Sequence, residues 1–327
     1  MIDIERILVE YPRHLVDARW VALGNAGGFS GSRIWRGTTF DGREFALKEY
    51  SLATTGRQLE RVHGWMRAAK EQGLPFVPAI EPASNCRTVA MVNESCWDVT
   101  SWMPGKSDFH DDPSDGKLFA AVEAIARIHA LWANLVPPTE QPCPAILRRW
   151  RATQDAEALL KNGPPLIDPD TESLLSNLDR AWALLHRQLP RMQALLEPWR
   201  SRLVTVQPCI GDVWHDHVLF EDNRVSGIID FAAAKVDVPE ADLARLLGSL
   251  IPGDHGRMRQ ALVVYAGIRP VPDYRLVEVL DVTGAFGAVV NWLNRFMRFP
   301  LPSVTRVAER FGKLVDRLDS LPGNAKL

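Results

Sequence analysis

The stretch Pro208–Leu250 constrains the fold of this chain more than any other. Two short apolar runs, Val218–Phe220 and Val225–Ile229, are separated by acidic and amide residues that are typical of a tight turn. This pattern predicts a β-hairpin, whose outer ends lie side by side. Asp212 precedes the first run and Asp230 follows the second, so we expect the two carboxylates to face one space. Such a pair suits a magnesium-bound nucleotide and an acceptor hydroxyl.

A glycine-rich segment near the N-terminus is a second candidate site. The predicted strands Trp20–Leu23 and Arg33–Gly37 flank a segment that contains four glycines. Glycine leaves backbone N–H groups open to an approaching phosphate, so we expect Gly27, Gly28 and Ser30 to contact phosphates. Taken alone, the segment could equally be an ordinary loop, because it lacks the Lys-Ser/Thr ending of a Walker loop.

The next two predicted elements add a lysine and a glutamate. In the predicted strand Glu44–Tyr50, Lys48 alternates with large apolar residues and therefore lies on the opposite face of the strand. The periodicity of Thr55–Gln72 predicts a helix that carries Glu60 in its first half. An exposed strand lysine is the alternative interpretation of Lys48. The order of glycine hairpin, strand lysine and helix glutamate favours a nucleotide site.

The central stretch resembles the aminoglycoside phosphotransferase and choline kinase family. The usual pattern of that family is H-G-D-x-x-x-x-N, a strand pair, I-D-[FW], and a later D-L-A that opens a helix. The corresponding segments of this chain are Ile210-Gly211-Asp212, His217, Ile229-Asp230-Phe231 and Asp242-Leu243-Ala244. Two residues depart from the pattern, because Ile210 stands where the family has His and His217 where it has Asn.

The resemblance implies a role for each candidate residue. Asp212 would act as the catalytic base, and His217 and Asp230 would hold the metal ion. Lys48 would bind the α- and β-phosphates of ATP and would be held by Glu60. The expected ion is Mg²⁺, or Mn²⁺ because imidazole nitrogen suits transition metals better. The adenine would lie against the backbone of three further residues, Ser101, Trp102 and Met103.

The resemblance also implies an α+β, two-lobed protein-kinase-like fold. Residues 1–103 would form a nucleotide-binding N-lobe with a small antiparallel sheet. Residues 104–327 would form a larger, mostly helical C-lobe with the catalytic loop and the substrate pocket. Apolar periodicity predicts the remaining helices over Lys117–Trp132, Ala145–Lys161, Asp168–Trp199, Glu240–Ile251, His255–Ala266, Tyr274–Met297 and Ser303–Leu318, with a loop over Leu135–Pro144.

Composition narrows the class of partner. The chain has 327 residues, of which 46% are hydrophobic and 24% charged, as in an ordinary globular protein. The net charge of −2 argues against nucleic acid or a membrane surface as a partner, so we expect a small molecule. The family resemblance implies that this small molecule is an alcohol that serves as the substrate. Four cysteines without a C-x-x-C pair, and an N-terminus without a signal peptide, predict a cytoplasmic protein.

Three functions fit these motifs. The first is a kinase that transfers the γ-phosphate of ATP to a hydroxyl of a small molecule, as members of the family do with aminoglycosides, choline or homoserine. The second is a degenerate relative that binds nucleotide or a partner without turnover, which the departures at Ile210 and His217 favour. The third is a metal-dependent hydrolase that uses His215, Asp216, His217 and Asp230.

Overall fold

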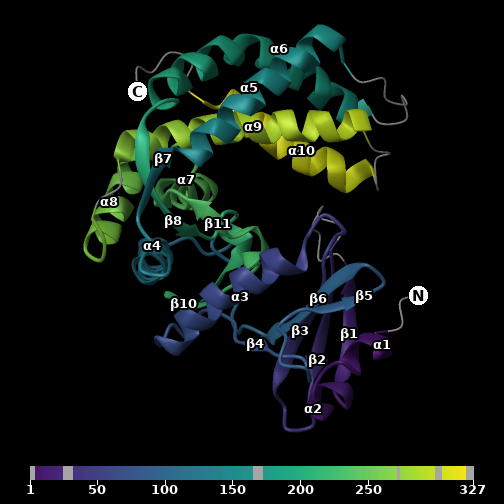
Figure 1. Cartoon of the computed structure of the whole chain (residues 1–327). Coiled ribbons are helices and arrows are strands. Elements are labelled where there is room, and N and C mark those ends of the chain that lie inside the picture. Colours follow the sequence, from purple (N-terminus) through teal and green to yellow (C-terminus); the bar gives the residue numbers. More distant parts are fainter. Residues whose placement is uncertain (1–3, 25–31, 165–171, 271–272, 299–303, 322–327) are drawn as a thin grey trace. The chain divides into compact units, whose positions relative to one another are not determined.

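The computed structural model describes residues 4–24, 32–164, 172–270, 273–298 and 304–321 (Figure 1). The chain forms two compact units by its internal contacts. The first consists of Met1–Leu135 and His215–Lys235, and the second of Val136–Trp214 and Val236–Leu327. Each unit is therefore built from two separate segments of sequence. The division into lobes after residue 103 is a different boundary and stays a prediction.

An antiparallel sheet with the strand order β1-β2-β3-β6-β4 forms the frame of the first unit, and β5 pairs with β6. The strands predicted over Trp20–Leu23, Arg33–Gly37 and Glu44–Tyr50 are confirmed as β1, β2 and β3. The strands are β1 (Arg19–Gly24), β2 (Arg33–Thr38), β3 (Glu44–Glu49), β4 (Ile80–Glu81), β5 (Ala90–Val92) and β6 (Ser95–Ser101).

One face of this sheet packs into an apolar core. Leu47 and Trp97 are buried there together with side chains from α1 (Glu5–Leu8) and α2 (Arg13–Val16). Successive side chains of a strand point to opposite faces, so Lys48 lies on the other side of the sheet, as predicted. The core thus fixes the face on which the lysine is displayed.

Two helices of the first unit begin at side-chain caps. Thr55 accepts a hydrogen bond from the Gln58 N–H at the start of α3 (Gly56–Glu71), and Ser114 caps α4 (Asp115–Trp132) in the same way. Both helices were predicted within two residues of these bounds. The Trp132 indole N–H donates to the backbone carbonyl of Trp65, 2.9 Å away, and so joins the two helices.

The predicted hairpin is formed by β9 (Val218–Glu221) and β10 (Arg224–Ile228), and it belongs to the first unit. The short 3₁₀ helices η2 (His215–His217) and η3 (Phe231–Ala233) adjoin its outer ends. The Ile228 N–H donates to the Phe76 carbonyl at 2.7 Å, which anchors the hairpin outside its own strands.

The second unit is mostly helical. Its long helix α9 contacts α5, α6, α7 and α10, and these contacts form the framework of the unit. The helices are α5 (Pro144–Asn162), α6 (Glu172–Leu196), α7 (Pro239–Leu250), α8 (His255–Ala266), α9 (Tyr274–Arg298) and α10 (Val304–Asp319), with the 3₁₀ helix η1 (Glu197–Trp199) after α6. All six α-helices correspond to predicted helices.

A small sheet in this unit corrects the sequence analysis. Its strand order is β11-β8-β7, with β7 (Thr139–Pro142), β8 (Leu203–Cys209) and β11 (Lys235–Asp237). The prediction of a loop over Leu135–Pro144 is therefore wrong for β7. The strand lies at the edge of the sheet, where a proline can be tolerated because one side of the strand needs no ladder hydrogen bonds.

Helix α9 is long and apolar enough to span a membrane by length and composition, over Tyr274–Met297. However, 72% of its most apolar window is buried within the protein. A core helix passes the same test, and the packing of α9 against four other helices accounts for its apolar character.

Candidate functional site

Lys48 and Asp230 form an ion pair in the first unit. The Lys48 ammonium donates to Asp230 Oδ1 at 2.7 Å, although 182 residues separate the two in sequence. The lysine side chain is 15% exposed and the aspartate 41%. Strand β3 of the sheet carries Lys48, and Asp230 follows the hairpin. The ion pair therefore joins two motifs that the sequence analysis identified separately.

The backbone and the electrostatics of Asp230 are both unusual. Its φ of 63° and ψ of 59° place it in the left-handed region, which a non-glycine residue seldom adopts outside functional or tightly constrained positions. Burial alone would raise the pKa of this carboxyl, but Lys48 and His217 outweigh burial and lower the pKa below its ordinary value. Asp230 is therefore held as a carboxylate.

His217 lies beside Asp230, as the family resemblance implies. The backbone carbonyl of His217 accepts from the Ile229 N–H at 2.9 Å, and Nε2 of its ring is 3.8 Å from Asp230 Oδ2. One oxygen donor and one nitrogen donor thus adjoin each other. This set fits a divalent cation that takes its other ligands from phosphate and water, and the nitrogen favours Mn²⁺ over Mg²⁺.

The predicted pairing of Lys48 with Glu60 is not formed. Among the described residues, Glu60 binds Arg87, whose guanidinium nitrogen Nη2 lies 2.9 Å from the Glu60 carboxylate. The helix α3 instead turns His63 toward the sheet, where it is buried. Whether Glu60 contributes to nucleotide binding stays a prediction.

A buried network that the sequence analysis missed lies next to Lys48. Asp98, which pairs with Lys48 in the register of β3 and β6, accepts from the Tyr50 hydroxyl at 2.7 Å and lies 2.9 Å from His63 Nε2. The Lys48 ammonium is 4.9 Å from the centre of the Tyr50 ring. Burial, followed by the charge of Asp98, raises the pKa of Tyr50 well above its ordinary value. The signal for this network in the sequence was Asp98, an acid that stands between the apolar residues Trp97 and Val99 of one strand.

The backbone of the predicted adenine site is partly engaged. The N–H groups of Ser101 and Trp102 donate to the carbonyls of Ala79 and Glu44, at 2.8 and 2.9 Å. Within the described part of the chain, the Met103 N–H has no hydrogen-bond partner. Met103 is therefore the best placed of the three predicted residues to bond an adenine edge through its backbone.

The predicted phosphate contacts Gly27, Gly28 and Ser30 lie outside the described residues.

In the second unit, Asp242 holds the loop that carries Asp212. The two oxygens of the Asp242 carboxylate accept from the backbone N–H groups of Ile210 and Gly211, at 2.6 and 2.8 Å. Asp242 and Ile210 are both fully buried. The aspartate of D-L-A therefore supports this loop through backbone contacts, which do not depend on a polar side chain at Ile210.

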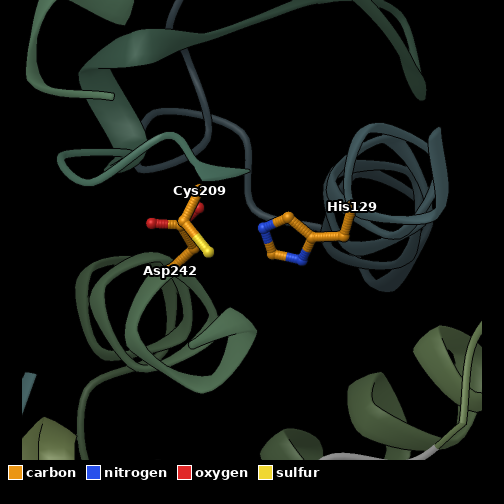
Figure 2. Close-up of side chains that lie close together, drawn as sticks. All are labelled: His129, Cys209 and Asp242. Atoms are coloured by element: carbon orange, nitrogen blue, oxygen red, sulfur yellow. The ribbon is translucent and has the colours of Figure 1, made fainter. Parts of the chain in front are cut away.

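Figure 2 shows Asp242 on α7 near Cys209, which ends β8. Burial and then the charge of Asp242 raise the pKa of the Cys209 thiol well above its ordinary value, so this cysteine is an unreactive thiol in the protein interior. His129, also labelled in Figure 2, is a buried residue of α4 in the first unit.

Asp212 forms an ion pair that the sequence analysis did not foresee. Arg245 Nε donates to Asp212 Oδ1 at 3.0 Å, and the Asp212 side chain is 48% exposed. Arg245 follows the D-L-A motif directly and is placed by the first turns of α7. Because Asp212 and Asp230 belong to different units, their expected approach to one space stays a prediction.

The residues of the hydrolase hypothesis do not converge. His215 lies 3.4 Å from Asp216, and His217 lies 3.8 Å from Asp230. Within the described residues, the four side chains do not bring three ligand atoms within 4.8 Å of one another. A zinc site with three protein ligands needs such a group, so the geometry speaks against this function.

The second unit also contains a cavity of about 420 Å³ between the start of β8, the start of α7 and the end of α8. Its lining includes Arg202, Gln207, Glu240, Tyr265 and Arg269, and none of the predicted site residues that the structure describes.

Comparisons with known proteins identify a family for this chain and solved structures with a similar fold. A family model for the phosphotransferase enzyme family matches residues 21–280. A solved aminoglycoside phosphotransferase from Alicyclobacillus acidocaldarius subsp. acidocaldarius is similar, with 17% identity, coverage of 98% of this chain and 94% of that chain, and a TM-score of 0.60. Spectinomycin phosphotransferase in complex with ADP and spectinomycin matches with 11% identity, 97% and 96% coverage, and a TM-score of 0.71.

A third solved structure, an amicoumacin kinase in complex with AMP-PNP and Ca²⁺, has 14% identity, 98% and 93% coverage, and a TM-score of 0.61. No curated protein matches the chain. These similarities confirm the predicted fold class: an α+β, protein-kinase-like fold with an antiparallel sheet and a mostly helical part.

Proposed function

The chain belongs to the phosphotransferase enzyme family, and from this premise we propose that it transfers the γ-phosphate of ATP to a hydroxyl of a small molecule. The observation that carries the proposal is the contact of Lys48 with Asp230, next to His217. These residues come from a strand, a hairpin end and the turn before that hairpin, and each stands at a position of the family pattern. Asp230 adjoins both other side chains, and such a cluster of a cation and two metal-binding groups suits a nucleotide and metal site.

The proposed roles follow from the charges of these side chains. Lys48 binds the α- and β-phosphates and neutralises part of their charge. Asp230 and His217 hold a divalent cation, which when bound neutralises charge that develops on the phosphates. Asp212 orients the acceptor hydroxyl and accepts its proton. Positioning and charge neutralisation account for most of the rate in such transfers, and no covalent intermediate is needed.

Nucleotide binding in this proposal includes an exchange of partners. Lys48 and Asp230 neutralise each other at 2.7 Å in the structure. With ATP and its cation bound, Lys48 would neutralise phosphate and Asp230 would hold the cation, so each charge would keep a counter-charge. The Met103 N–H then bonds the adenine edge, as in the connection between lobes of related kinases.

The transfer step also requires Asp212 to serve the same nucleotide as Asp230. The loop that carries Asp212 is suited to this role because Asp242 fixes its backbone through two hydrogen bonds. A fixed loop keeps the carboxylate at one position relative to the acceptor, and displacement by about 1 Å is enough to reduce such a rate severely.

Two variants test the proposal. Lys48→Ala should raise the Kd for ATP about tenfold, because it removes a charge-assisted bond to phosphate. Asp212→Asn keeps the shape of the side chain but removes its charge, so turnover should fall about 100-fold or more while the Kd for ATP changes little. Isothermal titration with AMP-PNP and a coupled ADP-release assay measure the two effects. Wild-type turnover in Asp212→Asn would remove Asp212 from the mechanism.

A protein that binds nucleotide without turnover is the second candidate. The replacement of the family's Asn by His217 favours it, because the substitution changes a ligand of the metal site. The two candidates differ in one result. If the wild-type protein binds AMP-PNP through Lys48 but transfers no phosphate to any of a broad panel of alcohols, sugars and aminoglycosides, the second candidate holds.

A further inference from the structure

The surroundings of Asp212 in the second unit are rich in arginine. Arg245 contacts the Asp212 carboxylate, and its guanidinium lies 5.4 Å from the centre of the Trp214 ring. Two further arginines, Arg148 and Arg149, stand in succession on α5. Charges of Arg148 and Arg245 both act on Arg149, so the three guanidinium groups lie in one neighbourhood.

The side chain of Arg149 packs against two glycines of α9. A Cβ atom at Gly284 would lie 3.1 Å from Arg149 Nη2, and one at Gly287 would lie 3.8 Å from Nη1. The first of these distances is tighter than ordinary van der Waals contact, so a side chain at Gly284 would require the guanidinium to shift by a few tenths of an ångström. The helix is thus shaped to receive an arginine at this place.

The neighbouring carboxylates are already paired. Arg148 binds Asp237, Arg245 binds Asp212, and Arg317 binds Asp281 in the described structure. Each of these three carboxylates thus has an arginine as its direct partner. The charges of Asp237 and Asp281 also favour the charged form of Arg149.

Arg149 itself lacks a direct partner. Its Nε atom is buried without a hydrogen bond, and the side chain forms no ion pair with any described residue. Burial, followed by the charges of Arg148 and Arg245, lowers the pKa of Arg149 to about 10, so it remains a cation at neutral pH. Arg149 as a whole is partly exposed, so an anion can reach it, and a buried guanidinium N–H without a partner is costly unless an acceptor meets it.

We propose that the acceptor substrate carries a negatively charged group, a carboxylate or a phosphate, which Arg149 binds while Asp212 receives the acceptor hydroxyl. This inference rests on the proposed function and names its substrate class. A guanidinium presents parallel N–H donors that match the two oxygens of such a group. A cationic acceptor, in contrast, would meet the positive charge of Arg149, which lacks the carboxylate partner that Arg148 and Arg245 have, and would be repelled.

A set of matched small molecules tests the charge preference. Glycerate, glycerol 3-phosphate, glycerol and choline all bear hydroxyls but differ in charge. Ligand-observed NMR with the full-length protein, in the presence of AMP-PNP and Mg²⁺, measures their binding without any need for turnover. We expect glycerate or glycerol 3-phosphate to bind about tenfold more tightly than glycerol and choline. The order of the two anions distinguishes a carboxylate site from a phosphate site. Tighter binding of choline than of both anions would overturn the inference.

Variants on α5 supply the matched control. Arg149→Gln should raise the Kd of the preferred anion about tenfold and leave glycerol unaffected. Arg151→Gln, which removes an exposed arginine two residues further along the same helix, should change neither. Arg149→Lys keeps the cation if the glutamine variant folds poorly, and it should retain part of the preference because only the fork of donors is lost. An anion Kd equal to wild type in both Arg149 variants would contradict the proposal.

The same measurements separate this inference from the proposed function. Transfer of phosphate from ATP to neutral or cationic acceptors, with no preference for anions, would leave the phosphotransferase intact and reject only the anionic acceptor. Failure to bind AMP-PNP, with anion binding at Arg149 unchanged, would reject the phosphotransferase function and with it the role of the anion as acceptor.

Discussion

At the scale of single residues, the proposed metal site depends on the charge of Asp230. Its pKa is lowered, so the carboxylate is present from below the ordinary aspartate range upward, and its contribution to stability is lost only as the pH falls through that lowered value. Protonation of Asp230 therefore cannot limit activity near neutral pH. Any loss of metal-dependent activity between about pH 7 and 6 must come from another group, and an imidazole ligand must be neutral to bind metal.

His217→Asn is the residue-scale test, because it restores the oxygen ligand of the family pattern. If His217 binds the cation, the wild-type protein should work at least as well with Mn²⁺ as with Mg²⁺. The asparagine variant should gain activity with Mg²⁺ relative to Mn²⁺, because an amide oxygen replaces the imidazole nitrogen. Initial rates with each metal, measured at several pH values, check this preference.

His215→Asn is the control, since His215 pairs with Asp216 rather than with Asp230. It should keep the wild-type metal preference. If His217→Asn and wild type share one metal preference and one pH profile, His217 does not touch the cation and only Asp230 remains as a protein ligand.

At the scale of secondary structure, α7 supports the loop that carries Asp212. Asp242→Asn leaves one oxygen to accept from two buried N–H groups, so one of them loses its partner and the charge is also removed. We expect a loss of about 2 to 4 kcal/mol in the free energy of unfolding, measured by urea denaturation. Asp254→Ala removes a similar side-chain cap at the start of α8, but an exposed one, and should cost only about 1 kcal/mol. Equal losses in the two variants would show that Asp242 is an ordinary helix cap.

The elements also show what the sequence could predict. Helices and strands with a clear apolar period, such as α8 and β3, were placed within a residue or two, because their own side chains define which face is buried. The strand β7 was missed, since its pairing with β8 arises from tertiary contact and not from a pattern of its own.

Within the site, motif spacing found the residues but not all of their partners. The family resemblance grouped His217 with Asp230, and the structure places the two side chains next to each other because antiparallel pairing fixes which residues meet. The rotation of α3 about its axis was not predictable to one residue, and this rotation sends Glu60 to Arg87 and His63 to Asp98. The pairing of Arg245 with Asp212 likewise depends on tertiary placement of a charged side chain.

At the scale of the whole molecule, the two units interleave in sequence. The chain leaves the first unit after Leu135, returns at His215 for the hairpin, and leaves again after Lys235. The hairpin is part of the interior of the first unit. Phe220 is buried with its ring 6.5 Å from that of Phe109, and its backbone exchanges hydrogen bonds with Lys106. The first unit is therefore complete only with both of its segments.

Three fragments test this organisation by thermal denaturation. Residues 1–103 alone, which correspond to the predicted N-lobe, lack α4 and the hairpin, and residues 1–135 alone lack the hairpin. A third fragment joins residues 1–135 to residues 215–235 through a flexible glycine-serine linker. Only the third can bury Phe109 and Phe220 together and form the ion pair of Lys48 with Asp230. It should show a cooperative transition, and residues 1–135 should melt about 5 °C or more lower, since about 1 kcal/mol shifts the Tm of a small domain by this amount. A Tm for residues 1–135 equal to that of the joined fragment would mean that the hairpin only rests on a unit that folds without it.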